Sequence, residues 1–179
     1  MTPQKFVSTY GEAANFIEQQ WEIPALVTLA QAALESGWGA KSPGYNFFGY
    51  TAPNGYTGQR QLLKTTEYHS TPNVWYPVRI KVTKVAENRY QYLVRRYFKC
   101  YSNAEQSFED YARLISTDKY ASAFDYQDDP ARFFTVIFNE GYATSTSYYS
   151  LVISIMQTIK KLIGGHMVAL FARAIITRF

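Results

Sequence analysis

One acidic residue, Glu35, stands near the end of an otherwise apolar stretch, "PALVTLAQAALESGWG", residues 24–39. The apolar spacing predicts a buried helix, and Gly37 follows it where a left-handed residue commonly ends a helix. A carboxyl group in the last turn of such a helix meets the negative end of the helix dipole and little water, so we expect a raised pKa for Glu35. A carboxylic acid that stays protonated near neutral pH is what general-acid cleavage of glycosides uses. From the residues alone, a carboxylate turned back to solvent or bound to a backbone N–H is an equal alternative.

Side chains that could bind a sugar follow Glu35 closely. Trp38 lies three residues on and would keep the surroundings of the acid apolar, while Phe47 and Phe48 belong to the motif "NFFG". Aromatic faces suit sugar rings, although packing in the core is an equally good reading of all three. Asn46, which opens the motif, either locks the local backbone or hydrogen-bonds a substrate.

Other kinds of chemistry lack the residues that they need. The chain has one cysteine, Cys100, and two histidines, His69 and His166. An internal disulfide is thereby excluded, and a histidine-rich metal site has too few ligands. A hydrolase built on Cys100 and His69 has no local signature to support it. We expect neither a metal nor another cofactor.

Helices flank a β segment in the predicted order of elements. A first helix begins at Thr2-Pro3 and runs to about Gln20, and the second is the one that carries Glu35. The Gly, Pro, Asn and Ser content of residues 39–61 predicts an irregular loop. Alternating apolar and polar residues over 78–83 and 89–96, joined by the turn-like "AENR", predict a β-hairpin.

Three further helices are expected in the C-terminal half. The first follows the capping box "SNAE" with Ser102 as N-cap, the second begins at Asp129-Pro130 and ends at Gly141, and the third begins at Ser147 and ends before Gly164. At 179 residues the chain fits one domain, which we assign to residues 1–163. Residues 164–179 form a tail to which the sequence assigns no role.

The basic residues gather in the middle of the chain. Residues 71–100 hold seven Lys and Arg against one acid, whereas each flanking segment carries one net negative charge. Arg79, Lys81, Arg95 and Arg96 on the hairpin could attract an anionic polymer or simply form a solvated strand face. No apolar run is long enough to span a membrane, and no signal peptide is visible at the N-terminus.

A resemblance to a known family becomes specific when the motifs are taken together. "LAQAALESGWG", "YNFFGY", "TTEY", "SFEDYARL" and "GYAT", in this order, resemble glycoside hydrolase family 73 of bacterial peptidoglycan hydrolases over about residues 2–163. The resemblance implies a lysozyme-like α+β fold, mainly α, in which a helical lobe and a small β-hairpin lobe hold a glycan strand in the groove between them.

The resemblance also implies roles for individual residues. Glu35 matches the catalytic acid of the family. Glu67 in "TTEYHS" matches its second carboxylate, placed just before the hairpin, with an exposed charge at a strand end as the alternative. Tyr142 in "GYAT" matches a tyrosine at the groove, with packing at a helix end as the alternative. Asp110 matches an acidic position but suits an exposed helix face equally well. The family commonly continues "YATDPNY", whereas this chain has Ser145 at the aspartate position, so an aspartate function there is not available.

The implied activity is hydrolysis of the β-1,4 bond between N-acetylglucosamine and N-acetylmuramic acid in peptidoglycan. Glu67 would activate water in an inverting mechanism, or the substrate's acetamido group would act as nucleophile with Glu67 in support. A muramidase or lytic transglycosylase of the same fold is one alternative, and a non-hydrolytic glycan-binding or assembly protein is another. We expect a monomer that acts on peptidoglycan strands at the cell wall, without nucleic acid, metal or membrane insertion.

Overall fold

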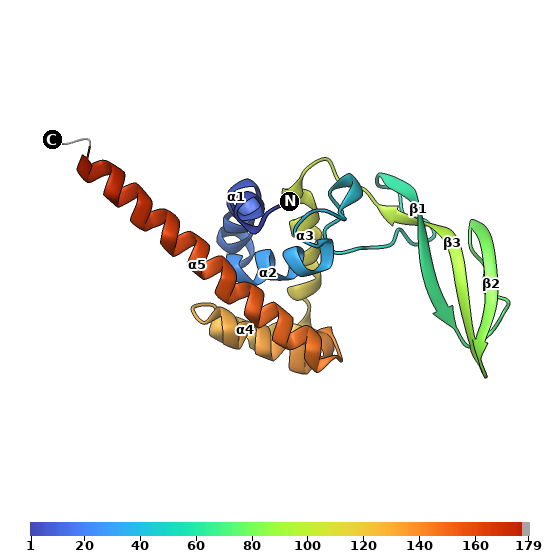
Figure 1. Ribbon diagram of the computed structural model, residues 1–179. Coiled ribbons are helices and arrows are strands. Elements are labelled where there is room, and N and C mark those ends of the chain that lie inside the picture. The colour runs from blue at the N-terminus through green and yellow to red at the C-terminus, as the bar shows by residue number, and fades with distance from the viewer. Residues whose placement is uncertain (177–179) are drawn as a thin grey trace.

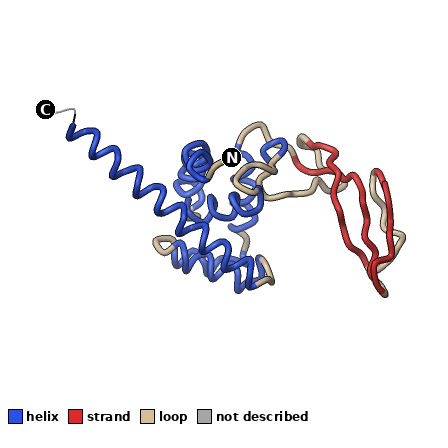
Figure 2. The backbone as a smooth tube through the Cα atoms, in the orientation of Figure 1, coloured by secondary structure: helices blue, strands red, loops and turns tan. Residues whose placement is uncertain are grey.

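The computed structural model describes the backbone of residues 1–176 and the side chains of residues 1–165. Its helices gather into one lobe, and a three-stranded sheet stands to one side of them (Figure 1 and Figure 2). The helices are α1 (Pro3–Trp21), α2 (Ala25–Ser36), α3 (Ala104–Ile115), α4 (Pro130–Ile137) and α5 (Thr146–Ile176), with short helical turns η1 (Pro43–Tyr45), η2 (Asp118–Tyr126) and η3 (Phe138–Tyr142). The strands are β1 (Arg60–His69), β2 (Val78–Ala86) and β3 (Arg89–Lys99).

The first two helices begin and end where the sequence predicts. The Thr2 side chain caps α1 by accepting a hydrogen bond from the Lys5 N–H at 3.2 Å, and Pro3 follows it. Pro24 precedes α2, and Gly37 ends α2 with φ 57°. Only glycine enters this left-handed region without steric cost, which explains why the helix stops there.

The core of the helical lobe is built around α2. Nine of its twelve residues are buried, so this helix is central rather than amphipathic. It packs against α1, α4 and α5, and aromatic side chains such as Phe47, Phe108 and Phe134 fill the space around it. The prediction of a central, buried second helix is therefore confirmed.

The sheet is larger than the predicted hairpin. Strands β2 and β3 form that hairpin, with Asn88 at φ 48° in its turn, but β1 pairs antiparallel with the other side of β3 to give the order β1-β3-β2. Glu67 does lie before the hairpin, as predicted, but residues 60–69 were not assigned to a strand, so β1 was missed. Polar residues, Thr65, Glu67 and His69, occupy half-buried positions of β1, so its sequence lacks the alternation of apolar and polar residues that identifies a strand.

Two predicted helix starts shift by one residue. Asn103, not Ser102, caps α3: its side chain accepts from the Gln106 N–H at 3.0 Å, and the Gln106 side chain accepts from the Ser102 N–H at 2.9 Å. The cap thus forms one position further on, and the Gln106 side chain reaches back to the residue before the N-cap. The last helix, α5, begins at Thr146 rather than Ser147. Asp129 caps α4 as expected, and the following turn η3 contains Gly141 at φ 82°.

The C-terminal helix does not end before Gly164, as the sequence analysis predicted. Helix α5 continues through Gly164 and Gly165 to Ile176, and its last part extends beyond the other helices (Figure 1). Glycine in a helix interior costs about 1 kcal/mol without forbidding the helix. The side chains of 166–176, and residues 177–179 altogether, lie outside the described residues. In the described part of the chain, no helix is both long and apolar enough to cross a membrane.

Candidate active site

Glu35 lies in the last turn of α2, immediately before a rigid helix end. Gly37, Trp38 and Gly39 all adopt positive φ, at 57°, 57° and 75°. The Trp38 N–H donates to the Ala33 carbonyl at 2.7 Å, and the Gly39 N–H donates to the Ser36 hydroxyl at 2.8 Å. These bonds fold the chain back on the helix end and fix the backbone that carries Glu35.

The Glu35 side chain is exposed, which corrects the predicted burial. Gln31, one turn earlier on the same face of α2, is fully buried. The apolar sequence around Glu35 correctly predicts a buried helix, and Ala33 and Ser36 in its last turn are fully buried, but the side of this turn that carries Glu35 is left uncovered. The carboxylate is therefore accessible to a ligand.

Three tyrosines lie near the carboxylate of Glu35. Burial is the largest cause that raises the pKa of Tyr50, Tyr142 and Tyr148, and the negative charge of Glu35 raises each of these pKa values further. The three half-buried phenols therefore remain neutral O–H groups through the physiological range. Hydroxyls of this kind can donate hydrogen bonds to the carboxylate or to a polar group of a substrate.

A buried amide sets the direction of the hydrogen bonds beneath Glu35. The Tyr111 hydroxyl donates to Gln31 Oε1, so the Gln31 Nε2 group is turned to donate to the Tyr148 hydroxyl, at 3.2 Å. Since Tyr148 accepts this bond, its own O–H is left to donate elsewhere. Tyr142 lies next to Tyr148, with 6.2 Å between ring centroids. The predicted site residues did not include Gln31, Tyr148 or Tyr50, although a lone amide four residues before Glu35 on an apolar helix is a usable signal.

The predicted sugar-binding residues differ in how deeply they are buried and in what they contact. Trp38 is half-buried and meets the Phe6 ring edge-on at 5.7 Å. Phe48 is only 8% exposed and stacks on Tyr111 at 4.5 Å. Asn46 is 5% exposed, and its side-chain amide hydrogen-bonds to the backbone. Its Nδ2 donates to the Tyr50 carbonyl at 2.8 Å, and its Oδ1 accepts from the Tyr50 N–H at 2.9 Å. These contacts match the backbone-locking reading of Asn46.

Glu67 lies on the sheet, apart from Glu35. Its carboxylate pairs with Arg96 Nη1 at 3.2 Å, and its Cα faces Tyr92 of β3. The sheet joins the helical lobe at the Arg60 end of β1, where Arg60 faces Lys99, and Glu67 is about 23 Å further along the strand. Among the described residues, no hydrogen bond or ion pair joins Glu67 to the helical lobe. The structure therefore does not bring the two carboxylates into contact.

Asp110 forms a junction between the lobes. Its Oδ2 atom accepts from Lys99 Nζ at 2.7 Å and from the Tyr101 hydroxyl at 2.6 Å. Lys99 ends β3 and Asp110 lies on α3, so the contact ties the sheet to the helices. This is a structural role for the acidic position that the resemblance singled out.

The Cys100 and His69 pair is too far apart for joint chemistry. His69 ends β1, whereas Cys100 follows the end of β3 that pairs with the start of β1, about 30 Å away. His69 instead bonds to the Tyr76 hydroxyl at 2.6 Å. Among the described residues, no group of three or more His, Cys, Asp or Glu could hold a metal.

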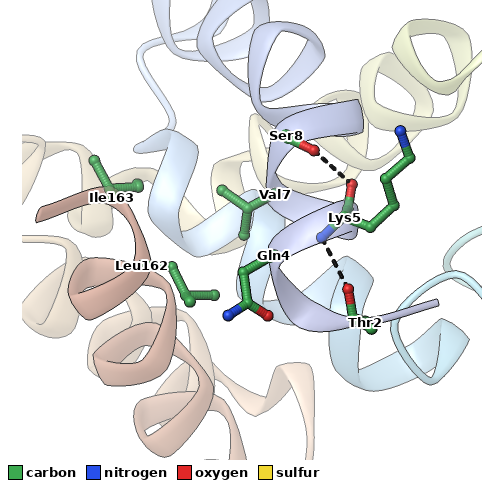
Figure 3. A pocket seen from close by; sticks show the side chains of 7 residues that line it. All are labelled: Thr2, Gln4, Lys5, Val7, Ser8, Leu162 and Ile163. Atoms are coloured by element: carbon green, nitrogen blue, oxygen red, sulfur yellow. Dashed lines mark hydrogen bonds between the residues drawn. The ribbon is translucent and has the colours of Figure 1, made fainter. Parts of the chain in front are cut away.

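A cavity of about 630 Å³ lies away from both acids. It separates the first turns of α1 from α5 and is lined by Val7, Leu162 and Ile163 together with Thr2, Gln4, Lys5 and Ser8 (Figure 3). No carboxylate lines it. The cavity therefore has no acid with which to cleave a glycoside.

Comparisons with known proteins agree with this arrangement. The glucosaminidase family model, described as mannosyl-glycoprotein endo-beta-N-acetylglucosaminidase, matches residues 11–161. Peptidoglycan hydrolase FlgJ from Vibrio parahaemolyticus is 28% identical over 169 residues, which are 90% of this chain and 49% of that protein. An autolysin from Enterococcus faecalis is 30% identical over 159 residues, which are 82% of this chain and 19% of that protein. The chain thus spans about half the length of the first of these relatives and a fifth of the second.

A solved structure shows the same fold. The glycoside hydrolase domain of FlgJ from Salmonella typhimurium aligns with a TM-score of 0.72 at 24% identity, over 100% of both chains. Its likeness confirms the predicted α+β class, with a helical lobe and a small antiparallel sheet. The family match covers most of the chain, including both glutamates and the tyrosines around Glu35. The chain therefore belongs to the glucosaminidase family of glycoside hydrolases.

Proposed function

We propose that the chain hydrolyses the β-1,4 bond between N-acetylglucosamine and N-acetylmuramic acid in peptidoglycan, with Glu35 as the general acid. The observation that carries the proposal is the exposed Glu35 carboxylate, fixed by a rigid helix end and surrounded by neutral tyrosine hydroxyls. Relatives that are named peptidoglycan hydrolase and autolysin support the choice of polymer. Such a substrate places the action at the cell wall or in the periplasm.

Glu35 would donate its proton to the glycosidic oxygen as the bond breaks. Tyr148, held by Gln31, would fix the orientation of the Glu35 carboxyl, and Tyr142 would bind the acetamido group of the sugar. A glycan seated over this face would also cover Glu35 and exclude water from it, which the free protein does not do.

The second step can follow two routes. In an inverting mechanism a second carboxylate activates water from about 6.5–9.5 Å across the bond. Glu67 could reach that position only if the sheet moved toward the helical lobe, because Glu67 lies far along β1 from the junction. In the alternative route the acetamido group of the substrate attacks first, and Glu67 has a supporting role. The position of Glu67 favours the second route in the arrangement seen here.

Trp38, Phe48 and Asn46 complete the proposed substrate-binding set. Half-buried Trp38 can offer part of its indole to a sugar ring. Phe48 and Asn46 are almost fully buried, so we assign them to holding the 46–50 loop under the glycan rather than to broad contact with it. The groove between the lobes is part of this proposal.

The test is digestion of purified peptidoglycan by the wild type, Glu35→Gln and Glu67→Gln. Products are reduced with borohydride and identified by mass spectrometry. We expect reduced N-acetylglucosamine ends from the wild type and a loss of at least about a hundredfold for Glu35→Gln, since general-acid catalysis contributes this much or more. A loss below about tenfold for Glu67→Gln supports the substrate-assisted route.

Two results would contradict the proposal. If Glu35→Gln cleaves as fast as the wild type, Glu35 is not the acid. If the wild type releases reduced N-acetylmuramic acid or anhydro ends, the enzyme is a muramidase or a lytic transglycosylase. Glu105→Gln is the matched control, because Glu105 is an exposed helix carboxylate in the first turn of α3 with no part in the site.

A further inference from the structure

A second pocket lies on the sheet lobe, beside the ion pair of Glu67. It measures about 390 Å³ and is lined by Arg60, Arg96, Tyr97, Tyr76, Trp75 and Asn54 with adjoining residues. This volume falls in the range of about 300–1,000 Å³ that small ligands occupy.

The charge in this pocket is positive. Arg60 and Arg96 are its charged residues, and no carboxylate lines it. The Arg60 guanidinium lies over the Tyr97 ring at 4.1 Å, and in the described part of the chain it makes no hydrogen bond or ion pair. Arg96 has one contact with Glu67 at 3.2 Å, which leaves most of its five N–H donors for a ligand.

The aromatic wall of the pocket is held in place before any ligand binds. The Tyr76 hydroxyl bonds to His69 Nε2 at 2.6 Å. The Tyr92 hydroxyl donates to the Thr71 carbonyl at 2.6 Å and accepts from the Val74 N–H at 3.2 Å, which fastens the 70–77 segment to β3. Trp75, which is 72% exposed, stands on this segment at the rim. A preformed wall lowers the entropy lost on binding.

We propose that this pocket binds a carboxylate of the acidic peptide that substitutes the glycan, so that the enzyme prefers peptide-bearing strands. The choice of peptide rests on the proposed function. A guanidinium matches a planar carboxylate through two parallel hydrogen bonds. The three rings beside the arginines would cover the aliphatic part of an amino acid, a surface that a phosphate polymer offers far less of. The contact between Arg96 and Glu67 places the peptide beside Glu67, the second carboxylate considered in the proposed function.

The experiment measures binding and cleavage separately. Calorimetry with a synthetic stem tetrapeptide, and with the same peptide after its carboxylates are amidated, reports the pocket without any cleavable glycosidic bond. We expect the wild type to bind the free-acid form about tenfold more tightly, and Arg60→Gln to lose this difference. Arg89→Gln is the matched control, because Arg89 is an exposed arginine on the same sheet that lies over the Tyr68 ring at 4.9 Å, outside the pocket.

Cleavage rates on native and carboxyl-amidated peptidoglycan complete the test. We expect the ratio of these rates to fall about tenfold in Arg60→Gln and to stay at the wild-type value in Arg89→Gln. Equal binding of the tetrapeptide by the wild type and Arg60→Gln would overturn the inference, and so would displacement of the peptide by an equal concentration of inorganic phosphate. If the wild type cleaves no peptidoglycan, the proposed function is contradicted. If the wild type cleaves it and the ratio of rates is unchanged in Arg60→Gln, only the proposed peptide pocket is contradicted.

Discussion

At the scale of single residues, one buried amide orders the hydroxyls beneath the proposed catalytic acid. Gln31 accepts from Tyr111 and donates to Tyr148, so both ends of its amide are hydrogen-bonded. Because Gln31 and Tyr111 are both fully buried, water cannot take the place of either partner. The Tyr148 hydroxyl therefore accepts a hydrogen bond from Gln31, and its own proton can be donated toward Glu35.

Replacing Tyr148 with phenylalanine tests this arrangement. Tyr148→Phe removes the hydroxyl but keeps the ring, so we expect kcat for peptidoglycan cleavage to fall about tenfold, the value of one hydrogen bond to a charged group. KM should change less than about twofold, because the proposed hydroxyl acts on Glu35 rather than on the bound glycan. Release of reducing ends measures both constants.

The neighbouring tyrosine provides the control for this substitution. The Tyr149 hydroxyl bonds to Thr135 Oγ1 at 2.9 Å, and its ring stacks on Phe134. Tyr149→Phe should keep the wild-type kcat and should lower the free energy of unfolding by about as much as Tyr148→Phe does. Equal kcat values for the two variants would remove Tyr148 from the mechanism, provided that thermal unfolding shows both to be folded.

At the scale of elements, two glycines test how α2 and α5 use their backbones. Gly37 ends α2 at φ 57°, and no atom lies within 4 Å of the position that an alanine methyl group would take, so the cost of Gly37→Ala is conformational. We expect it to lower the free energy of unfolding by about 1–2 kcal/mol. Gly164, inside α5, also has open space around it, and Gly164→Ala should raise the free energy of unfolding by up to about 1 kcal/mol. Urea unfolding measures both, and changes of the same sign would contradict the backbone assigned to one of the two helices.

Elements with strong local signals could be predicted from the sequence. Thr2-Pro3 and Asp129-Pro130 mark helix starts through their own side chains and ring geometry, and Gly37 marks a helix end. Strand β1 could not be predicted, because its pairing with β3 lies some 30 residues away in the chain. A strand without alternation depends on such a partner, and a single sequence does not show the partner.

The candidate site was predictable in part for the same reason. Glu35 and Tyr142 stand in recognisable motifs, whereas the partner of Gln31, Tyr148, lies 117 residues along the chain. The exposure of Glu35 was predicted wrongly, because its sequence neighbours are apolar and Ala33 and Ser36 beside it are buried, while no other element of the described chain covers the side of the last turn that carries Glu35. Burial of an end residue depends on where other elements stop, which periodicity within one helix does not report.

At the scale of the whole molecule, the sheet is attached to the helices at one end. Asp110 of α3 holds Lys99 and Tyr101, and the Asn46 amide donates to the Lys99 carbonyl at 3.0 Å. Beyond this junction β1 and β3 run away from the helical lobe (Figure 2). A sheet anchored at one end can pivot, and such a movement is what an active role of Glu67 requires.

Buried tyrosines link the stability of the whole molecule to alkaline pH. Burial raises the pKa of Tyr50, Tyr101, Tyr111 and Tyr148 above the ordinary value of 10.0. The unfolded chain therefore releases these protons at a lower pH than the folded chain, so their stabilising effect is complete below pH 10 and is lost as the pH rises beyond it.

We expect the free energy of unfolding to be insensitive to these groups near neutrality and to fall steeply above pH 10. Urea unfolding at a series of pH values measures this fall. Tyrosinate absorbance and circular dichroism should change together, because phenols from the 46–50 loop, the lobe junction, α3 and α5 can ionise only as the core opens. If all 16 tyrosines ionise while the helical signal persists, the burial of this cluster is not what stabilises the fold.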